Sequence, residues 1–339
     1  MQNPKIVPEP RLDDVRAALK TVFGTWNIGA LQQLRGGVSG ALILRFQLRK
    51  RDYVLRIEPE RVALQDRQRG FSCMTIAAAV GAAPAVHYSD PATGLSIMDF
   101  VPNRPLSLHP EGPVGAARAL GKLTAKLRSS PPFPIMIDYP ELIENVMISL
   151  TKSGHFASGQ LDRHADGLAL IRAALPWDAS SLVSSHNDPN VRNILFDGEH
   201  VWLVDWELAW RNDPLVDLAI LTTEVAQTPE LEEILLEAAF GAAPDRLLRA
   251  RLSVIRLLTR LFYGCIVLDS LSGTLLRSAS NEDLAGLTPT DFRAAVAEGR
   301  LASGSLDVAY AFAKMSLATF ITGLAAPGFR EVLEVVKQG

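Results

Sequence analysis

The sequence predicts an α+β fold with two lobes: a β-rich N-terminal lobe over residues 1–101 and a mainly helical C-terminal lobe over residues 102–339. Short apolar runs separated by turn residues dominate the first lobe, whereas helical periodicity dominates from Gly112 onward. A chain of 339 residues is also long enough to form two hydrophobic cores.

The composition is that of a globular protein and excludes several functional classes. Hydrophobic residues make up 48% of the chain and charged residues 21%. The net charge of -3 provides no basic field for nucleic acid. No stretch approaches the ~18 uninterrupted apolar residues of a membrane span, and the N-terminus lacks an apolar signal region. Cys73 and Cys265 lie far apart in apolar contexts, which indicates neither a disulfide framework nor a thiolate metal site. We therefore expect a cytoplasmic protein without a nucleic-acid or membrane partner, and the oligomeric state is left open.

The N-terminal lobe is expected to begin with a helix. Residues 11–23 place apolar side chains at helical spacing and acidic residues early, as at the start of a helix. The other expected elements are a β-rich run within 34–48, a turn at Arg51-Asp52, a strand at 53–57, a helix at 66–80, and strands at 84–87 and 95–100.

A glycine-rich turn precedes the first of these strands. Gly36, Gly37 and Ser39 lie in it, and glycines allow backbone N–H groups to approach phosphates closely. This pattern fits a flap over the phosphates of ATP, and it fits a plain glycine-containing hairpin equally well. Arg56, in the next strand, alternates with apolar neighbours and should point to the opposite face from Leu55.

The C-terminal lobe is expected to be built largely from helices. A Ser-Ser-Pro-Pro loop at 129–132 ends the first of them, because proline and the residue before it disfavour helical geometry. Helical patterns cover residues 114–127, 140–152, 160–175, 229–240, 244–270, 290–300 and 306–323.

The motif with the clearest chemistry lies between residues 186 and 205. His186, Asp188 and Asn193 have the spacing H-x-D-x-x-x-x-N, which is typical of the catalytic loop of kinase-type phosphotransferases. Asn193 leads into the apolar run 194–196, Asp-Gly at 197–198 indicates a turn, and a second apolar run ends just before Asp205. A β-hairpin would therefore bring Asp205 back beside Asp188 and Asn193.

These side chains suit phosphoryl transfer from ATP. Mg²⁺ prefers carboxylate, amide and phosphate oxygens, and Asn193 and Asp205 can supply the protein oxygens. Asp188 can orient an acceptor hydroxyl and take its proton as the catalytic base. The alternative is an ordinary hairpin in which Asp and Asn serve only as turn formers and caps.

The segment after Asp205 indicates a small acceptor. Protein kinases continue with a long activation segment that carries the peptide platform. Here Asn212-Asp213-Pro214 already begins an apolar, helix-like segment. This spacing leaves no room for such a platform, so we expect a small-molecule acceptor.

The residues D-W-E-x-A-x-x-N-D-P-x-x-D-L-A, from Asp205 to Ala219, resemble the choline/ethanolamine kinase branch of the aminoglycoside-phosphotransferase-like kinases. The resemblance is strongest over residues 184–222 and continues more weakly over about 31–105. It implies a protein-kinase-like fold and ATP and Mg²⁺ as donor and metal.

The resemblance also implies roles for individual residues. Arg56 takes the place of the strand lysine that contacts the nucleotide phosphates, and the guanidinium fork of arginine suits phosphate oxygens. Backbone groups from Asp99 to Val101 would meet the adenine edge, although an edge strand with a linker fits this segment equally well. Leu195, two residues after the metal-binding Asn193, would pack under the adenine.

Position 70 departs seriously from the family pattern. Gly70 stands where the family has the helix glutamate that pairs with the basic strand residue. Asp66, Glu58 or Glu60 would then have to replace it, and their spacing does not select among them. This departure motivates an alternative hypothesis, a nucleotide-binding pseudoenzyme with a signalling or binding role.

Further residues are expected near the acceptor or under the catalytic loop. Glu207 and Asp213 are candidates for contacts with the acceptor because they lie close to Asp205 in the chain. Tyr263 stands where choline-kinase-like proteins carry a tryptophan of an aromatic cage, which binds quaternary ammonium groups. The acceptor is expected to be an amine-bearing molecule of choline/ethanolamine, aminoglycoside or thiamine type. His186 is expected to be structural, and Asp217 either caps a helix or, as in the resembling family, braces the catalytic loop.

Overall fold

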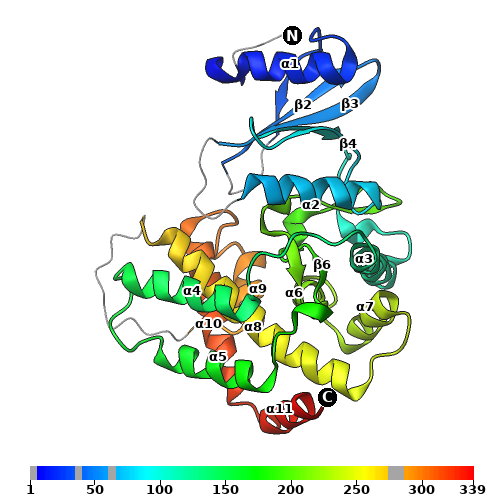
Figure 1. Ribbon diagram of the computed structural model, residues 1–339. Helices are drawn as coiled ribbons and strands as arrows, with labels where there is room; N and C mark the ends of the chain where they lie inside the picture. The colour runs from blue at the N-terminus through cyan, green and yellow to red at the C-terminus, as the bar shows by residue number, and fades with distance from the viewer. Residues whose placement is uncertain (1–5, 35–39, 60–65, 274–285) are drawn as a thin grey trace. The chain divides into compact units, whose positions relative to one another are not determined.

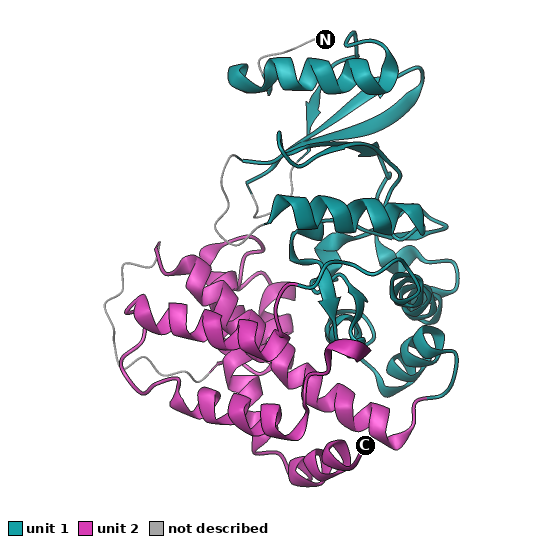
Figure 2. Ribbon diagram, viewed as in Figure 1, with its two compact units in different colours: residues 1–135, 182–243 teal, residues 136–181, 244–339 magenta. Residues whose placement is uncertain are grey.

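The computed structural model describes residues 6–34, 40–59, 66–273 and 286–339. Two compact units divide the chain, one formed by residues 1–135 and 182–243 and the other by residues 136–181 and 244–339 (Figure 2). The predicted boundary between lobes at residues 101 and 102 is a different division and stays a prediction. The fold class is confirmed, because a sheet-rich N-terminal part is followed by a mainly helical C-terminal part (Figure 1).

The N-terminal part of the first unit is an antiparallel sheet with the strand order β1-β2-β3-β5-β4. The helix α1, Leu12–Phe23, lies against it (Figure 1). The strands are β1 (Gln32–Gln33), β2 (Leu42–Leu48), β3 (Arg51–Ile57), β4 (Val86–Asp90) and β5 (Leu95–Asp99).

Alternation along the strands gives this sheet two different faces. One face joins α1 in a hydrophobic core that contains Leu44, Leu55 and Ile97. The opposite face carries Arg56 and Met98 and lines a cavity. The prediction that Arg56 points away from Leu55 is therefore confirmed.

The hairpin between β2 and β3 differs from the sequence prediction. Leu48 pairs with Arg51, so Arg49 and Lys50 form the turn, and the prediction of a turn at Arg51-Asp52 is wrong. Both turn residues have positive φ values, 51° and 67°, as a tight two-residue hairpin requires. The register also places Tyr53 opposite Phe46, with the two rings stacked.

The first unit continues with helices and two short sheets. Strand β6 pairs with β9, and β7 pairs with β8 as the predicted hairpin. The pairing of β6 with β9 was not predicted, because each strand has only three residues. These elements are α2 (Arg67–Ala79), α3 (Gly112–Arg128), β6 (Val183–Ser185), β7 (Ile194–Phe196), β8 (Val201–Leu203), the 3₁₀ turn η6 (Trp206–Leu208), β9 (Trp210–Asn212), α6 (Leu215–Glu224) and α7 (Pro229–Phe240).

The second unit is built from helices in its described residues. Its hydrophobic contacts include Tyr139 against Phe262, with ring centroids 5.4 Å apart. The helices are α4 (Tyr139–Lys152), α5 (Asp162–Ala174), α8 (Arg246–Leu271), α9 (Pro289–Ala297), α10 (Leu306–Leu324) and α11 (Phe329–Gln338).

Many helices begin where a side chain accepts a backbone N–H of the first turn, which satisfies an otherwise unpaired donor. The capping residues are Asp66, Asp138, Thr228, Asp245, Thr288 and Ser305. Among the described residues no single helix is long and apolar enough to cross a membrane. Within the part of the chain that the structure describes, the pair α10 and α11 has sufficient length and composition when taken together, and the two helices are bent by 78°.

Candidate active site

A cavity of about 480 Å³ lies within the first unit. Its walls come from the face of the sheet opposite α1, from α2, and from the hairpin β7–β8 with the turn that follows it. Several predicted site residues line this cavity, namely Arg56, Asp99, Val101, Asn193, Leu195, Asp205 and Glu207.

The buried carboxylate of Asp217 accepts backbone hydrogen bonds from the loop that carries the H-x-D-x-x-x-x-N motif. Asp217, on α6, accepts the backbone N–H of His186 through Oδ2 at 2.8 Å and that of Asn187 through Oδ1 at 2.7 Å. Asp217 is only 3% exposed. Of the two roles that the sequence left open, bracing of the loop is therefore the observed one.

His186 is fully buried beneath the loop, in the structural position that the sequence predicts. Its Nδ1 lies 3.3 Å from the backbone N–H of Asp188, and its Nε2 lies 3.0 Å from the carbonyl oxygen of Val204. In this pattern Nδ1 accepts and Nε2–H donates. The imidazole thereby ties the loop that carries Asp188 to the end of the hairpin.

The side chain of Asp188 is oriented by two amides. Its Oδ1 accepts Nδ2 of Asn190 at 2.8 Å, and its Oδ2 accepts Nδ2 of Asn193 at 3.0 Å. Nδ2 of Asn193 also donates to the carbonyl oxygen of Asp188 at 2.9 Å. Because both of these bonds use the amide nitrogen of Asn193, its amide oxygen points away from Asp188.

The predicted hairpin brings Asp205 back towards this loop. Ile194 pairs with Leu203, and the N–H of Val204 donates to the carbonyl oxygen of Asn193 at 3.0 Å. Asp205 follows at once, in the left-handed region with a φ of 71°. This turn in the backbone lets Asp205 and Asn193 line the same cavity.

Sequence reasoning missed Asn187, which locks the loop to the segment after Asp205. Asn187 has a φ of 65°, and its Nδ2 donates to the carbonyl oxygen of Leu208 at 2.9 Å. Its Oδ1 accepts Nδ2 of Asn212 at 2.7 Å. An asparagine between a histidine and an aspartate is a recognisable left-handed candidate, because asparagine tolerates positive φ.

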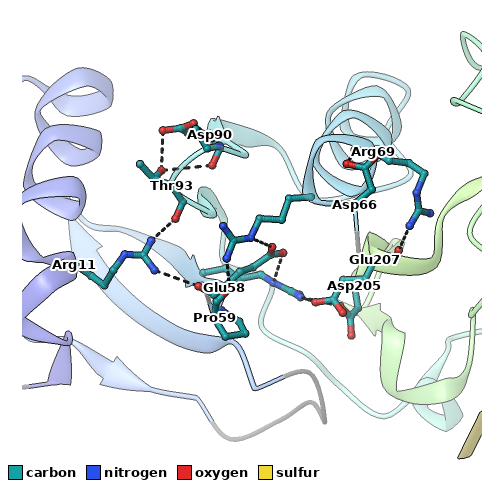
Figure 3. A network of polar contacts seen from close by, with 12 residues as sticks. Arg11, Glu58, Pro59, Asp66, Arg69, Asp90, Thr93, Asp205 and Glu207 are labelled. Atoms are coloured by element: carbon teal, nitrogen blue, oxygen red, sulfur yellow. Dashed lines mark hydrogen bonds and ion pairs between the residues drawn. The ribbon is translucent and has the colours of Figure 1, made fainter. Parts of the chain in front are cut away.

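Arg56 lies among three carboxylates. Its Nη2 donates to Oδ1 of Asp205 at 3.0 Å and to Oε1 of Glu207, and its Nε lies 3.6 Å from Oε1 of Glu58. Figure 3 shows Glu58, Asp205 and Glu207 as members of one network of polar contacts. The structure thus brings the predicted phosphate contact, Arg56, directly to the predicted metal ligand, Asp205.

Burial and charge shift the pKa values of this network. Burial acts against the charge of Arg56, but the carboxylates of Asp205, Glu207 and Glu58 outweigh it and raise the pKa of Arg56. Burial, supported by the charge of Asp205, raises the pKa of Glu207 to about 7, although Arg56 opposes this shift. The positive charge of Arg56 is therefore secure at neutral pH.

The segment expected to meet an adenine follows β5. The N–H of Asp99 donates to the carbonyl oxygen of Ala85 at 2.9 Å, and the N–H of Phe100 donates to that of Asp52 at 3.2 Å. These two donors are therefore already used within the protein. Leu195, half-buried on β7, lines the cavity as well.

Arg69 on α2 binds the turn after Asp205 through hydrogen bonds, and the sequence analysis did not single out this residue. Arg69 is 4% exposed and donates to the carbonyl oxygens of Ala209 at 2.7 Å and Glu207 at 2.9 Å. Figure 3 shows Arg69 reaching from α2 towards Glu207. A buried arginine within an apolar helix is a signal for such a contact, because burying a cation requires hydrogen-bond partners.

Other predicted residues are not gathered here. Gly36, Gly37 and Ser39 lie outside the described residues, as does Glu60. Asp213 is 3% exposed, does not line the cavity, and accepts the N–H of Leu215 through Oδ1 at 2.8 Å. This position fits a role at the start of α6 and gives no support to a contact with an acceptor.

Tyr263 lies on α8 of the second unit, so the prediction of an acceptor contact stays a prediction. Its ring packs at 5.7 Å from that of Phe262 and at 6.1 Å from that of Phe312.

The donor set at the end of the hairpin fits Mg²⁺ better than a transition metal. Asn193 and Asp205 offer one amide oxygen and one carboxylate, which are hard oxygen ligands. Among the described residues no group of three or more His, Cys, Asp or Glu side chains is arranged to hold a metal ion. Mg²⁺ bound through few protein ligands together with substrate phosphates is compatible with both observations.

The sequence profile of the phosphotransferase enzyme family matches residues 30–250, well over half of the chain. The matched range contains every residue of the cavity described above.

The solved structures with a similar fold carry the names of small-molecule kinases and phosphotransferases. A choline/ethanolamine kinase family protein from Mesorhizobium loti is 25% identical with a TM-score of 0.69, covering 97% of this chain and 99% of that one. A choline kinase from Streptococcus pneumoniae is 14% identical with a TM-score of 0.62, covering 91% and 99%; the same kinase has been solved in complex with AMP. A spectinomycin phosphotransferase, solved with ADP and spectinomycin, is 13% identical with a TM-score of 0.54, covering 96% and 97%.

A curated relative from Metamycoplasma hominis, described as an uncharacterized protein, is 31% identical over 101 residues. These residues are 29% of this chain and 20% of the relative, so the chain matches about a fifth of that protein's length.

Proposed function

The chain belongs to the phosphotransferase enzyme family, and on this basis we propose that it transfers the γ-phosphoryl group of ATP to a hydroxyl group of a small molecule. One observation carries the proposal. Asp188, Asn193 and Asp205 are collected at one end of the hairpin β7–β8, and Arg56 reaches Asp205 inside a cavity of about 480 Å³. Such a cavity lies within the usual range for small-molecule sites.

In the proposed reaction Asp188 is the general base. The acceptor oxygen forms a bond to the γ-phosphorus while the bond between that phosphorus and the β–γ bridging oxygen breaks. ADP leaves with the electron pair of the broken bond, and the hydroxyl proton passes to the carboxylate of Asp188. The amides of Asn190 and Asn193 hold this carboxylate, so its orientation is set before the acceptor arrives.

Asn193 and Asp205 are proposed to hold Mg²⁺. The amide nitrogen of Asn193 is bonded to Asp188, which leaves the amide oxygen for a cation. The cation held there would supply positive charge that offsets the charge developing on the phosphates during transfer. Arg56 is proposed to contact the phosphates through its guanidinium fork.

The adenine is proposed to lie between Leu195 and the segment from Asp99 to Val101. Because the N–H groups of Asp99 and Phe100 are paired within the protein, we assign the adenine contacts to the carbonyl oxygen of Asp99 and the N–H of Val101. Gly36, Gly37 and Ser39 remain proposed contacts to the phosphates.

An amine-bearing acceptor remains the proposed class, of choline/ethanolamine, aminoglycoside or thiamine type. Glu207 supports this proposal because it places a carboxylate beside Asp205 on the wall of the cavity. A carboxylate in this position would attract a cationic acceptor and oppose an anionic one. Tyr263 remains a second proposed contact, and a cytoplasmic location remains the expected one.

A phosphorylation screen tests this function. The protein would be incubated with ATP and Mg²⁺ and with choline, ethanolamine, thiamine, homoserine or an aminoglycoside, and ADP release would be followed together with the mass of the product. Asp188→Asn is the control for contaminating kinases. Product with the unmodified protein alone supports the proposal, whereas ATP binding without turnover on any acceptor would favour the pseudoenzyme.

A further inference from the structure

The basic residue on β3 has no acidic partner at the expected place on α2. A Cβ added at Gly70 would lie 3.4 Å from the carbonyl oxygen of Trp206 and 3.7 Å from Cα of Glu207. Position 70 therefore faces the backbone of η6, and α2 packs against this turn at close range. A carboxylate for Arg56 has to come from another element.

Glu58 supplies a carboxylate from the same strand end. It lies two residues after Arg56, so both side chains point to the same face. Its Oε1 is 3.6 Å from Nε of Arg56, and its Oε2 is 3.4 Å from Nε of Arg67, the first residue of α2. The side chain of Glu58 is 8% exposed, and that of Arg56 is 12% exposed. The carboxylate thus bridges strand and helix with one oxygen for each arginine.

The backbone around Glu58 is held from both sides. Its N–H donates to the carbonyl oxygen of Gly94 at 2.9 Å, and its own carbonyl oxygen accepts Nη1 of Arg11 at 3.2 Å. Arg67 donates to the carbonyl oxygen of Pro59. Figure 3 shows Arg11, Glu58 and Pro59 in this arrangement. A carboxylate on a fixed backbone loses little conformational freedom when it holds a neighbour.

Gly94 makes room for Arg67 in this arrangement. Its φ is 66°, and an added Cβ would lie 3.0 Å from Cζ of Arg67. A side chain here would therefore be strained and would press on the guanidinium. The tight approach gives an independent reason to regard the position of Arg67 as specified by the fold.

We propose that Glu58 is the positioning residue for Arg56, and that Arg67 links this pair to α2 in place of a glutamate at position 70. The inference rests on the proposed function, since Arg56 is positioned for the phosphates of ATP. A pair of opposite charges still joins the end of the strand to the helix, with the acid, Glu58, just after β3 and the base, Arg67, at the start of α2.

The other two carboxylates near Arg56 are less suited to this role. Asp205 is the proposed metal ligand, so in the loaded site it shares its charge with the cation. Glu207 lies two residues after Asp205, on the turn η6 that follows the hairpin, and so belongs to the same element as the proposed metal ligand. Of the three, only Glu58 directly follows the strand that carries Arg56, and its carboxylate is paired with Arg67 of α2.

The test compares Glu58→Gln, which keeps the shape of the side chain and removes its charge, with the unmodified protein. Removing a negative charge near bound ATP would by itself strengthen ATP binding. If Glu58 positions Arg56, its replacement should instead weaken ATP binding. We expect the Kd for Mg·ATP and the KM for ATP to rise about tenfold, a typical size for the loss of one buried ion pair that orients its partner, with kcat changing less than about twofold.

Asp52→Asn provides the matched control. Asp52 lies at the turn end of the same strand, four residues before Arg56, where it pairs with Arg45 at 3.1 Å and does not line the cavity. This variant removes a carboxylate from an arginine pair and should leave ATP binding unchanged within about twofold.

A double-mutant cycle separates positioning from general weakening. In an Arg56→Gln background, Glu58→Gln should change the KM for ATP by less than about twofold, because its effect runs through Arg56. An equal effect in both backgrounds, or ATP binding by Glu58→Gln as tight as that of the unmodified protein, would overturn the inference.

A second cycle needs no nucleotide and tests the link to α2. The effects of Glu58→Gln and Arg67→Gln on the denaturation midpoint should be clearly non-additive, and additivity would overturn the link. Failure of the unmodified protein to bind ATP would overturn both this inference and the proposed function. Tight ATP binding that Glu58→Gln does not change would overturn this inference and leave the proposed function in place.

Discussion

The brace under the catalytic loop offers a demanding test of how this site is held. We consider Asp217→Asn, which removes a charge and exchanges one carboxylate oxygen for an NH₂ group. In the structure each oxygen of Asp217 accepts a different backbone N–H, from His186 and from Asn187. An amide can accept only one of these two donors, and its NH₂ group would face the other.

The magnitude follows from these contacts and from burial. A buried donor left unpaired costs ~1–3 kcal/mol, and exchanging a charged acceptor for a neutral one at the remaining bond adds ~1 kcal/mol. Because Asp217 is only 3% exposed, water cannot easily replace the lost acceptor. We therefore expect Asp217→Asn to lower the free energy of unfolding by about 3 kcal/mol. The displaced loop should also lower kcat, because Asp188 follows the two braced residues.

Asp197→Asn is the matched control. Asp197 also accepts two backbone N–H groups, from Glu199 at 2.8 Å and from His200 at 2.7 Å, but both bond to the same oxygen, Oδ1. An amide oxygen can keep both bonds, and the side chain is 27% exposed. We expect this variant to cost less than about 1 kcal/mol.

The assay is equilibrium urea denaturation of both variants and the unmodified protein, followed by circular dichroism, with kcat measured on any acceptor that the screen identifies. Equal losses of unfolding free energy in Asp217→Asn and Asp197→Asn would refute the reasoning. Burial and the use of separate oxygens would then have no effect on the cost of the substitution. Unchanged unfolding with reduced kcat would also contradict a bracing role.

Four further predictions follow from the site and the buried groups. Asp188→Asn should lower kcat by ~10²–10⁴-fold and leave Mg·ATP affinity nearly unchanged; calorimetry that showed binding lost with activity would contradict the role of base. Asp205→Ala should remove the Mg²⁺ dependence of nucleotide binding, and equal ATP affinity with and without Mg²⁺ in the unmodified protein would rule out this assignment. Burial lowers the pKa of His164 to about 4, so below pH 6.5 the unfolded chain takes up a proton at this histidine that the folded chain does not. The free energy of unfolding therefore decreases as the pH drops below 6.5. Between pH 7 and pH 5 this should cost about 2 kcal/mol, a loss that urea titrations should find absent in His164→Gln. Burial raises the pKa of both Cys73 and Cys265 to about 12, so iodoacetamide at pH 8 should label neither thiol until denaturant is added, and rapid labelling of the native protein would contradict their burial.

The parts of the site that depend on short stretches of chain were predictable. The spacing of Asp188 and Asn193, the Asp-Gly turn and the two apolar runs together predict the hairpin, and the observed register returns Asp205 to this loop. These relations are determined by alternation and turn geometry over a few residues, which local sequence specifies. The family and the α+β fold were predictable for the same reason, because the motif is contiguous.

The partners of Arg56 were decided only by the tertiary structure. Arg56 and Asp205 are 149 positions apart, and their contact depends on how β3, α2 and the hairpin pack together. The carboxylate nearest in sequence, Glu58, was one of three candidates that spacing could not separate. The bracing role of Asp217 was also decided only by the tertiary structure. The same holds for the internal pairing of the N–H groups of Asp99 and Phe100. Except for Glu58, the partners of these polar groups lie far away in the chain, and which partner is within reach depends on the packing of whole elements.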